Sequence, residues 1–365
     1  MANIKVKYIM GKLFSLLCFL IGLSSNLYAA NTQKGIETAI KKQAERLLQD
    51  SRFTSVSIGV VNTNKSITGH YGELTKKQGN KPTDQTIYEI GSVSKTMVGL
   101  LAAYAIAEGN LSLDKNVNDY IDNQLDKVSA IAHPITIQQL LTHTSGLPKD
   151  IEQLGLTEET ANNHSFIKAM NKFDASKLKG QFHYSGTGSE LLSYILEQTY
   201  HKPFDELLKQ TLRERAGMVD TQVNLSHTQM PFFAYGYDDK NGIAKSHVAP
   251  NKLWGGRGFI KSTMADLINY MKLQLQEEQP AIALSHKQLF DVADNEYLAF
   301  FWIVANDEKL GTYLIHHGGV ESTQNWMIIF PTQELAISVI SNSSFPDGAQ
   351  LLREVGMNIA SSLIN

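Results

Sequence analysis

The chain has 365 residues, of which 42% are hydrophobic and 19% charged, and its formal net charge at pH 7 is −3. This composition is typical of a globular protein with a sizeable core, organised as one large domain or two smaller ones. The small net charge gives no sign of a nucleic-acid-binding surface, so we expect no nucleic-acid partner.

Residues 1–30 have the pattern of a secretory signal peptide. An apolar run at residues 13–23 follows a basic start and precedes small residues at Ala29 and Ala30, although the cleavage site is imperfect. We expect a periplasmic or secreted protein, with membrane attachment only if this segment remains uncleaved. The single cysteine, Cys18, lies in the same segment, so the mature chain is expected to lack disulfides and thiolate metal sites.

The first elements after this segment are a helix and a hairpin. Apolar residues recur at helical spacing over residues 36–49, which predicts an amphipathic helix. Residues 55–61 and 66–71 then form two predicted strands, joined by a polar turn at residues 62–65.

Ser92 stands at the start of the next predicted helix. Residues 97–107 are apolar on most faces, which indicates a buried helix ending near Gly109. Residues three apart share a helix face, so Lys95 can reach Ser92, and burial disfavours the charged form of the lysine. We therefore predict that Ser92 is a nucleophile and that Lys95 helps to deprotonate it. The alternative is an N-capping serine followed by a surface lysine.

The Ser-x-x-Lys pattern alone is weak evidence, because it occurs four times in the chain. The four matches begin at Ser92, Ser112, Ser165 and Ser176. Only Ser92 opens a long apolar helix, which is why we single it out.

The rest of the chain is predicted to be helical in the middle and mainly strands towards the end. Helices are expected at residues 135–141, 189–198 and 204–212. A capping-box pattern at residues 263–266 is expected to open a helix at residues 267–275. Four strands and a last helix should follow, at residues 297–304, 311–316, 326–330, 335–341 and 349–363.

This order of elements predicts an α/β fold. Strands at both ends favour one antiparallel sheet, flanked by helices and built from residues 31–110 and 250–365. A mainly helical subdomain, residues 111–249, would be inserted between the two parts. We expect residues 31–365 to form a single domain.

Two further glycine-containing stretches are candidate parts of a site. One is Phe182-His183-Tyr184-Ser185-Gly186-Thr187-Gly188, and the other is Ile315-His316-His317-Gly318-Gly319. The chain has no Gly-x-Ser-x-Gly elbow and no His-Glu-x-x-His pattern, which argues against an α/β-hydrolase and against a zinc enzyme. We expect neither a metal nor an organic cofactor.

The motifs together resemble the serine β-lactamase-related family, which includes class C β-lactamases, D,D-peptidases and family VIII-type esterases. The resemblance rests on Glu89-Ile90-Gly91-Ser92-Val93-Ser94-Lys95, on Leu140-Leu141-Thr142-His143-Thr144-Ser145-Gly146-Leu147-Pro148, and on the C-terminal stretch from Ile329 to Pro346. It implies a β-lactamase/transpeptidase-like fold. It also implies a serine hydrolase that forms an acyl-enzyme on Ser92 and cleaves β-lactams, D-Ala peptides or small esters. The partner would be a small-molecule or peptidoglycan-derived substrate.

The resemblance also implies roles for the two glycine-containing stretches. The Tyr-Ser-Asn motif of the family falls on Tyr184-Ser185-Gly186, which makes Tyr184 the proton shuttle. The Lys-Thr-Gly motif falls on His316-His317-Gly318, and the oxyanion would bind the N–H groups of Ser92 and Gly319. Adjacent strand residues face opposite ways, so one histidine should face the cleft; a one-residue slip would make it His317.

Two departures from the family pattern bear on the substrate. Gly186 replaces the asparagine, and a histidine replaces the lysine that would attract a substrate carboxylate. Both point to esters or peptides without an essential carboxylate. They also leave open a non-catalytic penicillin- or peptidoglycan-peptide-binding protein. Arg257, in a glycine-rich stretch, either meets an anionic substrate group or belongs to a plain turn.

Overall fold

The computed structural model describes residues 33–63, 65–121, 134–238, 240, 242–243, 246 and 252–364. The expected signal peptide at residues 1–30, with Cys18, lies outside this range. Among the helices of the described residues, none combines the length and the apolar character needed to cross a membrane.

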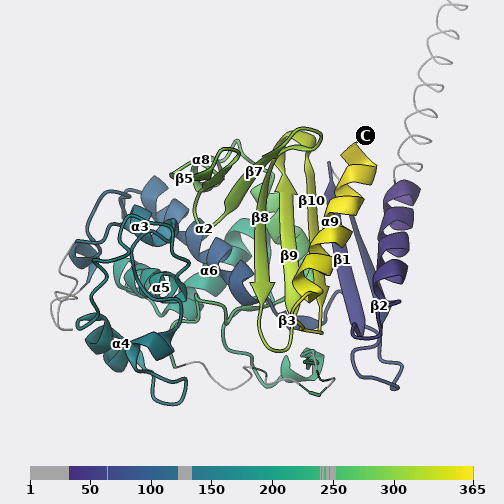
Figure 1. The fold of residues 1–365 in the computed structure, drawn as a ribbon, viewed down its shortest axis with the longest axis horizontal. Coiled ribbons are helices and arrows are strands. Elements are labelled where there is room, and N and C mark those ends of the chain that lie inside the picture. Colours follow the sequence, from purple (N-terminus) through teal and green to yellow (C-terminus); the bar gives the residue numbers. More distant parts are fainter. Residues whose placement is uncertain are drawn as a thin grey trace, which may run out of the picture.

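An antiparallel sheet of eight strands forms the centre of the protein, and both ends of the chain contribute to it (Figure 1). Its order is β2-β1-β10-β9-β8-β7-β6-β5, so the first hairpin lies beside the last strand, as the sequence predicted. The strands are β1 Ser55–Asn62, β2 Lys65–Gly72, β5 Phe290–Ala293, β6 Glu296–Leu298, β7 Ile303–Asp307, β8 Gly311–Gly319, β9 Gln324–Phe330 and β10 Leu335–Ser341.

The two faces of the sheet carry separate cores, because side chains alternate along each strand. Ile328 and Ile337 pack on one side against helix α9 (Gly348–Ile364) and the helix at residues 33–47. These two helices lie at the right of Figure 1, in yellow and purple. Met327 and Ala336 face the other side, where α7 (Met264–Gln274) and the large helical core lie.

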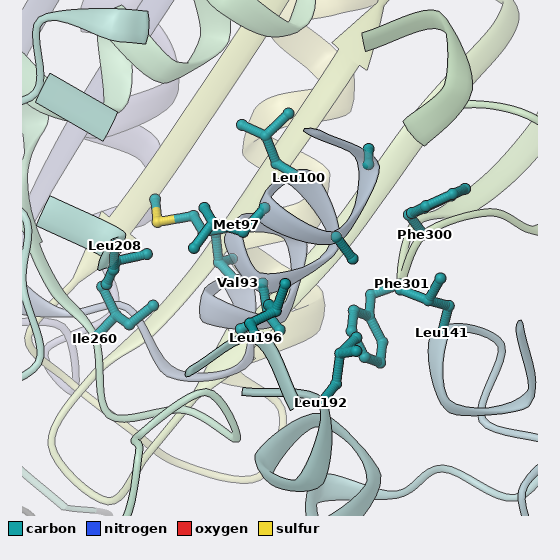
Figure 2. Packing of buried hydrophobic residues seen from close by; sticks show 14 of the residues in the cluster. Val93, Met97, Leu100, Leu141, Leu192, Leu196, Leu208, Ile260, Phe300 and Phe301 are labelled. Atoms are coloured by element: carbon teal, nitrogen blue, oxygen red, sulfur yellow. The ribbon is translucent and has the colours of Figure 1, made fainter. Parts of the chain in front are cut away.

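Helix α2 (Ser94–Ala107) runs through that helical core, and residues 94–105 are all buried. Leu192 and Leu196 of α5, Leu208 of α6 and Phe300 surround it (Figure 2). Gly99 permits the closest approach, since a Cβ there would lie 2.5 Å from the Phe300 carbonyl oxygen. The helix ends two residues before Gly109, which has a left-handed φ of +78°.

Among the described residues between 111 and 249 there are four α-helices: α3 Ile137–Leu141, α4 Asn163–Met170, α5 Gly186–Tyr200 and α6 Phe204–Ala216. Three of them were predicted. Helix α5 begins earlier than expected because the Ser185 side chain caps it, accepting from the Gly188 N–H. The sequence analysis missed α4, although Asn162 and Ser165 form a reciprocal capping box there.

The predicted strand at residues 297–304 is wrong. Strand β6 ends at Leu298 and β7 begins at Ile303, and residues 299–302 form a buried reversal between them. Phe301 lies in that reversal at a φ of +64°. Residues 299–302 are apolar because they pack against α2 and α3. The sequence analysis had interpreted the same apolar residues as part of a strand. Helix α8 (Pro280–Ser285) and strand β5 were also missed.

A second, two-stranded sheet pairs β3 (Ile87–Glu89) with β4 (Lys261–Thr263). Thr263 caps α7, so this helix starts three residues before the predicted residue 267. Strand β3 leads directly into the turn that carries Ser92, and the small sheet therefore fixes the entry to the candidate site.

Candidate active site

Ser92 lies on a 3-10 turn, Gly91–Val93, immediately before α2. Gly91 has a φ of +51°, and a Cβ there would lie 2.6 Å from the Gly319 nitrogen. Strand β8 is thus packed against the turn, and the Gly319 N–H lies beside Ser92, as the predicted oxyanion site requires. Asn325 of β9 ties the two together, because its amide donates to the carbonyls of Ile90, at 2.9 Å, and Gly318, at 3.3 Å.

Lys95 is buried, with 1% of its surface exposed, and its amine contacts Ser92. The Nζ atom lies 3.0 Å from Ser92 Oγ and 2.5 Å from the carbonyl oxygen of Arg257. The nucleophile and its predicted base are therefore within hydrogen-bonding distance.

Tyr184 lies just before α5 and brings its ring to the same place. Lys95 Nζ is 5.0 Å from the centroid of the Tyr184 ring. The ring of His143 stacks on the other side, with 4.5 Å between centroids. His143 adopts a left-handed φ of +56° and accepts the Ser185 N–H at Nδ1, which fixes both the loop and the proton on Nε2. This histidine was assigned only to a structural landmark of the family.

His316 and His317 occupy the end of β8 and face opposite sides of the sheet. Leu314, two residues before His316, belongs to the core around α2, and His317 stacks on Trp326 with 5.0 Å between ring centroids. The pairing between β7 and β8 reaches only to Ile315 of β8. The part of β8 after Ile315 therefore has no partner from β7 and faces the cavity on that side. Both histidines border the cavity for this reason, whereas we expected only one of them to face it.

These residues surround one cavity of about 280 Å³. Most of its wall is aromatic or aliphatic, and the polar groups gather at the Ser92 end. The lining residues are Ser92, His143, Lys149, Phe182, Tyr184, Leu298, Phe301, Ile303, His316, His317, Gly319 and Trp326.

The imidazoles in this wall are neutral. Burial, with the nearby positive charge of Lys95 as the second cause, lowers the pKa of His316 to about 3 and holds the pKa of His143 well below its usual range. Burial also lowers the pKa of His317 to about 4. His316 Nδ1 donates to the His317 carbonyl at 2.8 Å, so its other ring nitrogen carries a lone pair and no proton.

Arg257 does not border the cavity among the described residues. Its guanidinium contacts the carboxylate of Glu158 at 2.9 Å and packs over the Phe259 ring. Lys149, which does line the cavity, is exposed to solvent. The cavity thus offers little to fix a substrate carboxylate.

The serines of the other three Ser-x-x-Lys matches lie away from the cavity. Ser112 Oγ donates to the Asp114 carboxylate, and Ser165 Oγ accepts the N–H of Asn162 in the capping box of α4. Ser176 does not line the cavity. Of the four serines, Ser92 alone borders the cavity.

The structure gives a steric reason for the glycine at position 186, which the sequence alone could not reveal. A Cβ at this position would lie 2.7 Å from the Lys149 carbonyl oxygen and 3.6 Å from the Arg257 Cβ. The Lys149 carbonyl therefore occupies the space that a side chain would need at the position where the family pattern has an asparagine.

Comparison with known proteins points to one family. A family model described as Beta-lactamase matches residues 40–359. A beta-lactamase of Pseudomonas fluorescens is 29% identical over 269 residues, which cover 70% of this chain and 71% of that protein. A beta-lactamase of Providencia stuartii is 26% identical and covers 92% of this chain and 93% of its own length.

Solved structures share the fold. A Beta-Lactamase/D-Alanine Carboxypeptidase from Pseudomonas syringae has a TM-score of 0.78 at 20% identity, covering 89% of this chain and 98% of that one. A class C beta-lactamase from Rhodobacter sphaeroides has a TM-score of 0.74 at 19% identity, covering 88% and 98%. These similarities confirm the β-lactamase/transpeptidase-like fold expected from the sequence.

Proposed function

The chain belongs to the beta-lactamase family, and from that membership we propose that it is a serine hydrolase that works through an acyl-enzyme on Ser92. The observation that carries the proposal is the contact of 3.0 Å between Lys95 Nζ and Ser92 Oγ at the end of a cavity. A buried lysine one helical turn from a serine supplies the base that a hydroxyl nucleophile needs.

In the proposed cycle, Ser92 Oγ attacks the substrate carbonyl carbon while Lys95 takes its proton. The N–H groups of Ser92 and Gly319 stabilise the negative charge on the carbonyl oxygen. The bond to the leaving group then breaks, and the proton passes from Lys95 through Tyr184 to that group. In the second half, water attacks the acyl carbon while Lys95 takes a proton from the water. The bond between that carbon and Ser92 Oγ then breaks, the acid product leaves, and the proton passes from Lys95 to Oγ.

The wall of the cavity favours neutral substrates. His316 carries no positive charge near neutral pH, and the Arg257 guanidinium is paired with Glu158. The remaining lining, including Phe182, Phe301 and Trp326, is apolar surface that stabilises an apolar acyl group by burial. We propose esters with a neutral acyl chain as the preferred substrates, ahead of carboxylate-bearing β-lactams and D-Ala peptides.

The proposal keeps the periplasmic or secreted location, on the basis of the pattern at residues 1–30. It also keeps a small-molecule or peptidoglycan-derived substrate. A non-catalytic binding protein of the same fold remains the competing function, and the experiment separates the two.

The experiment measures hydrolysis of p-nitrophenyl butyrate, a chromogenic cephalosporin and a D-Ala-D-Ala peptide, together with labelling by a fluorophosphonate. We expect the ester to be the best substrate and one label to attach at Ser92. Ser92→Ala should abolish both, and Ser112→Ala, at another Ser-x-x-Lys match, should retain both. Absence of a covalent adduct on the folded wild-type protein would favour the binding protein, and activity retained in Ser92→Ala would exclude the acyl-enzyme.

A further inference from the structure

Glu190 is a buried acid for which the proposed cycle has no use. It lies on α5, six residues after Tyr184, and its exposed fraction is 0%. Burial raises the pKa of its carboxyl group, which expresses the cost of keeping a charge away from water. A buried carboxylate is retained at such a cost only where hydrogen bonds compensate it.

The hydrogen bonds that compensate Glu190 come from a single loop. Oε1 accepts the Gly255 N–H at 2.7 Å, and Oε2 accepts the Arg257 N–H at 3.0 Å. The residue between them is pressed against the same helix, since a Cβ at Gly256 would lie 2.0 Å from Ser193 Oγ. The carboxylate thus fixes two alternate amides of this loop against α5.

The carbonyl group of Arg257, in the same loop, contacts the lysine that lies beside Ser92. Arg257 donates its N–H to Glu190 and, with its carbonyl oxygen, accepts from Lys95 Nζ at 2.5 Å. A neutral amine has two N–H groups and one lone pair. In the structure Nζ donates to Ser92 Oγ at 3.0 Å and to the Arg257 carbonyl at 2.5 Å, so when Lys95 gives up the proton that faces Ser92, its lone pair is directed at Ser92 Oγ.

We propose that Glu190 is a positioning residue, which holds the Arg257 carbonyl so that the Lys95 amine stays directed at Ser92. The inference rests on the proposed function, because it gives Lys95 the role of base. Glu190 itself contacts neither the substrate nor Ser92. The group that accepts the hydrogen bond from Lys95 is the backbone carbonyl of Arg257.

The test compares Glu190→Gln with Asp266→Asn. Asp266 is a matched control: it is 3% exposed, accepts the N–H groups of Val219 and Asp220 at 3.1 and 2.8 Å, and does not border the cavity. A glutamine at position 190 keeps the size but can accept from only one of the two amides. Both variants should lose thermal stability to a similar degree.

The two variants should differ in chemistry. Displacing a catalytic group by about 1 Å costs on the order of 100-fold in rate, so we expect Glu190→Gln to lower kcat for p-nitrophenyl butyrate by about 10- to 100-fold, with KM within about threefold of wild type. The rate of fluorophosphonate labelling at Ser92 should fall by the same factor. Asp266→Asn should keep both rates.

Each outcome decides a separate question. Wild-type labelling rates in folded Glu190→Gln, or an equal loss in Asp266→Asn, would overturn the positioning role and leave the serine hydrolase intact. A wild-type protein that neither hydrolyses the ester nor takes the label would instead contradict the proposed function. Should Glu190→Gln fail to fold, Glu190→Asp is measured in the same way, because it keeps both acceptor oxygens on a shorter side chain. It should then show a smaller loss in kcat, and an unchanged kcat would overturn the proposal.

Discussion

Acidification should destabilise this protein through the imidazole of His316. The folded pKa is about 3, against 6.5 for a free histidine, because the ring is 5% exposed and lies near Lys95. The unfolded chain therefore takes up a proton at a higher pH than the folded one. The contribution of His316 to stability is complete above pH 6.5 and is lost progressively as the pH falls towards 3.

The magnitude follows from the two pKa values. Between about pH 7 and about pH 5, protonation of His316 in the unfolded chain costs the folded state about 1.9 kcal/mol. Near pH 5.5, the unfolded chain holds about 0.9 more protons at this site than the folded one, which gives a slope of about 1.2 kcal/mol per pH unit. Against a total stability of about 5–15 kcal/mol, this change is large.

The assay is urea unfolding at several values between about pH 5 and pH 7, for wild type, His316→Gln and His227→Gln. The quantity to compare is the difference in slope between the variants. Glu190 and Asp266 have raised pKa values and therefore stabilise the folded state as the pH falls, but this effect is common to all three proteins and cancels in the difference. His316→Gln should remove about 1.2 kcal/mol per pH unit from the wild-type slope. The exposed His227 is the control and should leave the slope unchanged. A His316→Gln slope equal to that of wild type would refute the buried neutral imidazole.

Three further predictions concern packing around the site. Gly186→Asn should destabilise the fold by about 1–3 kcal/mol, because its Cβ would lie 2.7 Å from the Lys149 carbonyl oxygen. The control Gly35→Asn, at an exposed helical position where nothing lies within 4 Å of a Cβ, should be tolerated, and equal melting temperatures for the two variants would contradict this. Asn325→Ala should cost about 1–3 kcal/mol and slow Ser92 labelling, since the buried Ile90 carbonyl loses its donor; unchanged denaturant unfolding would exclude that role. Arg257→Ala should change kcat/KM by less than about threefold and stability by at most about 1 kcal/mol, because the carbonyl that Lys95 uses belongs to the backbone; a tenfold loss in kcat/KM would show that the side chain matters.

The contact between Ser92 and Lys95 could be predicted from the sequence because the relevant signal is local. Ser92 and Lys95 are three residues apart, and the apolar run behind them predicts a buried helix without any knowledge of the fold. The sheet built from both chain ends was also predictable, since each strand carries its own alternating pattern. The resemblance to a known family then supplied Tyr184 and the end of β8, which no local pattern would have connected to Ser92.

The sequence could not reveal features that depend on contacts between distant segments. An apolar run such as residues 297–304 has the same composition as a strand or as a buried reversal, and only the contact of Phe300 with Gly99 distinguishes them. His143 lay in a recognised landmark, but its place beside Tyr184 follows from the loop that precedes α5. Glu190 looked like an ordinary polar position on an amphipathic helix.

The most informative departure from the family pattern is Gly186, and its meaning changes once the structure is considered. Judged from the sequence, the missing asparagine weakened the case for an efficient β-lactamase or a strict D,D-carboxypeptidase, because a side chain that would hydrogen-bond Lys95 or the substrate was lost. In the structure, the Arg257 carbonyl accepts a hydrogen bond from Lys95 Nζ at 2.5 Å. A backbone carbonyl is held less firmly than a side chain on a helix, so the loop needs an anchor of its own. The buried carboxylate of Glu190, on the helix that starts at Gly186, meets that need. The Arg257 carbonyl thus gives Lys95 a hydrogen-bonding partner without the asparagine, so the absence of asparagine is no argument against an active serine.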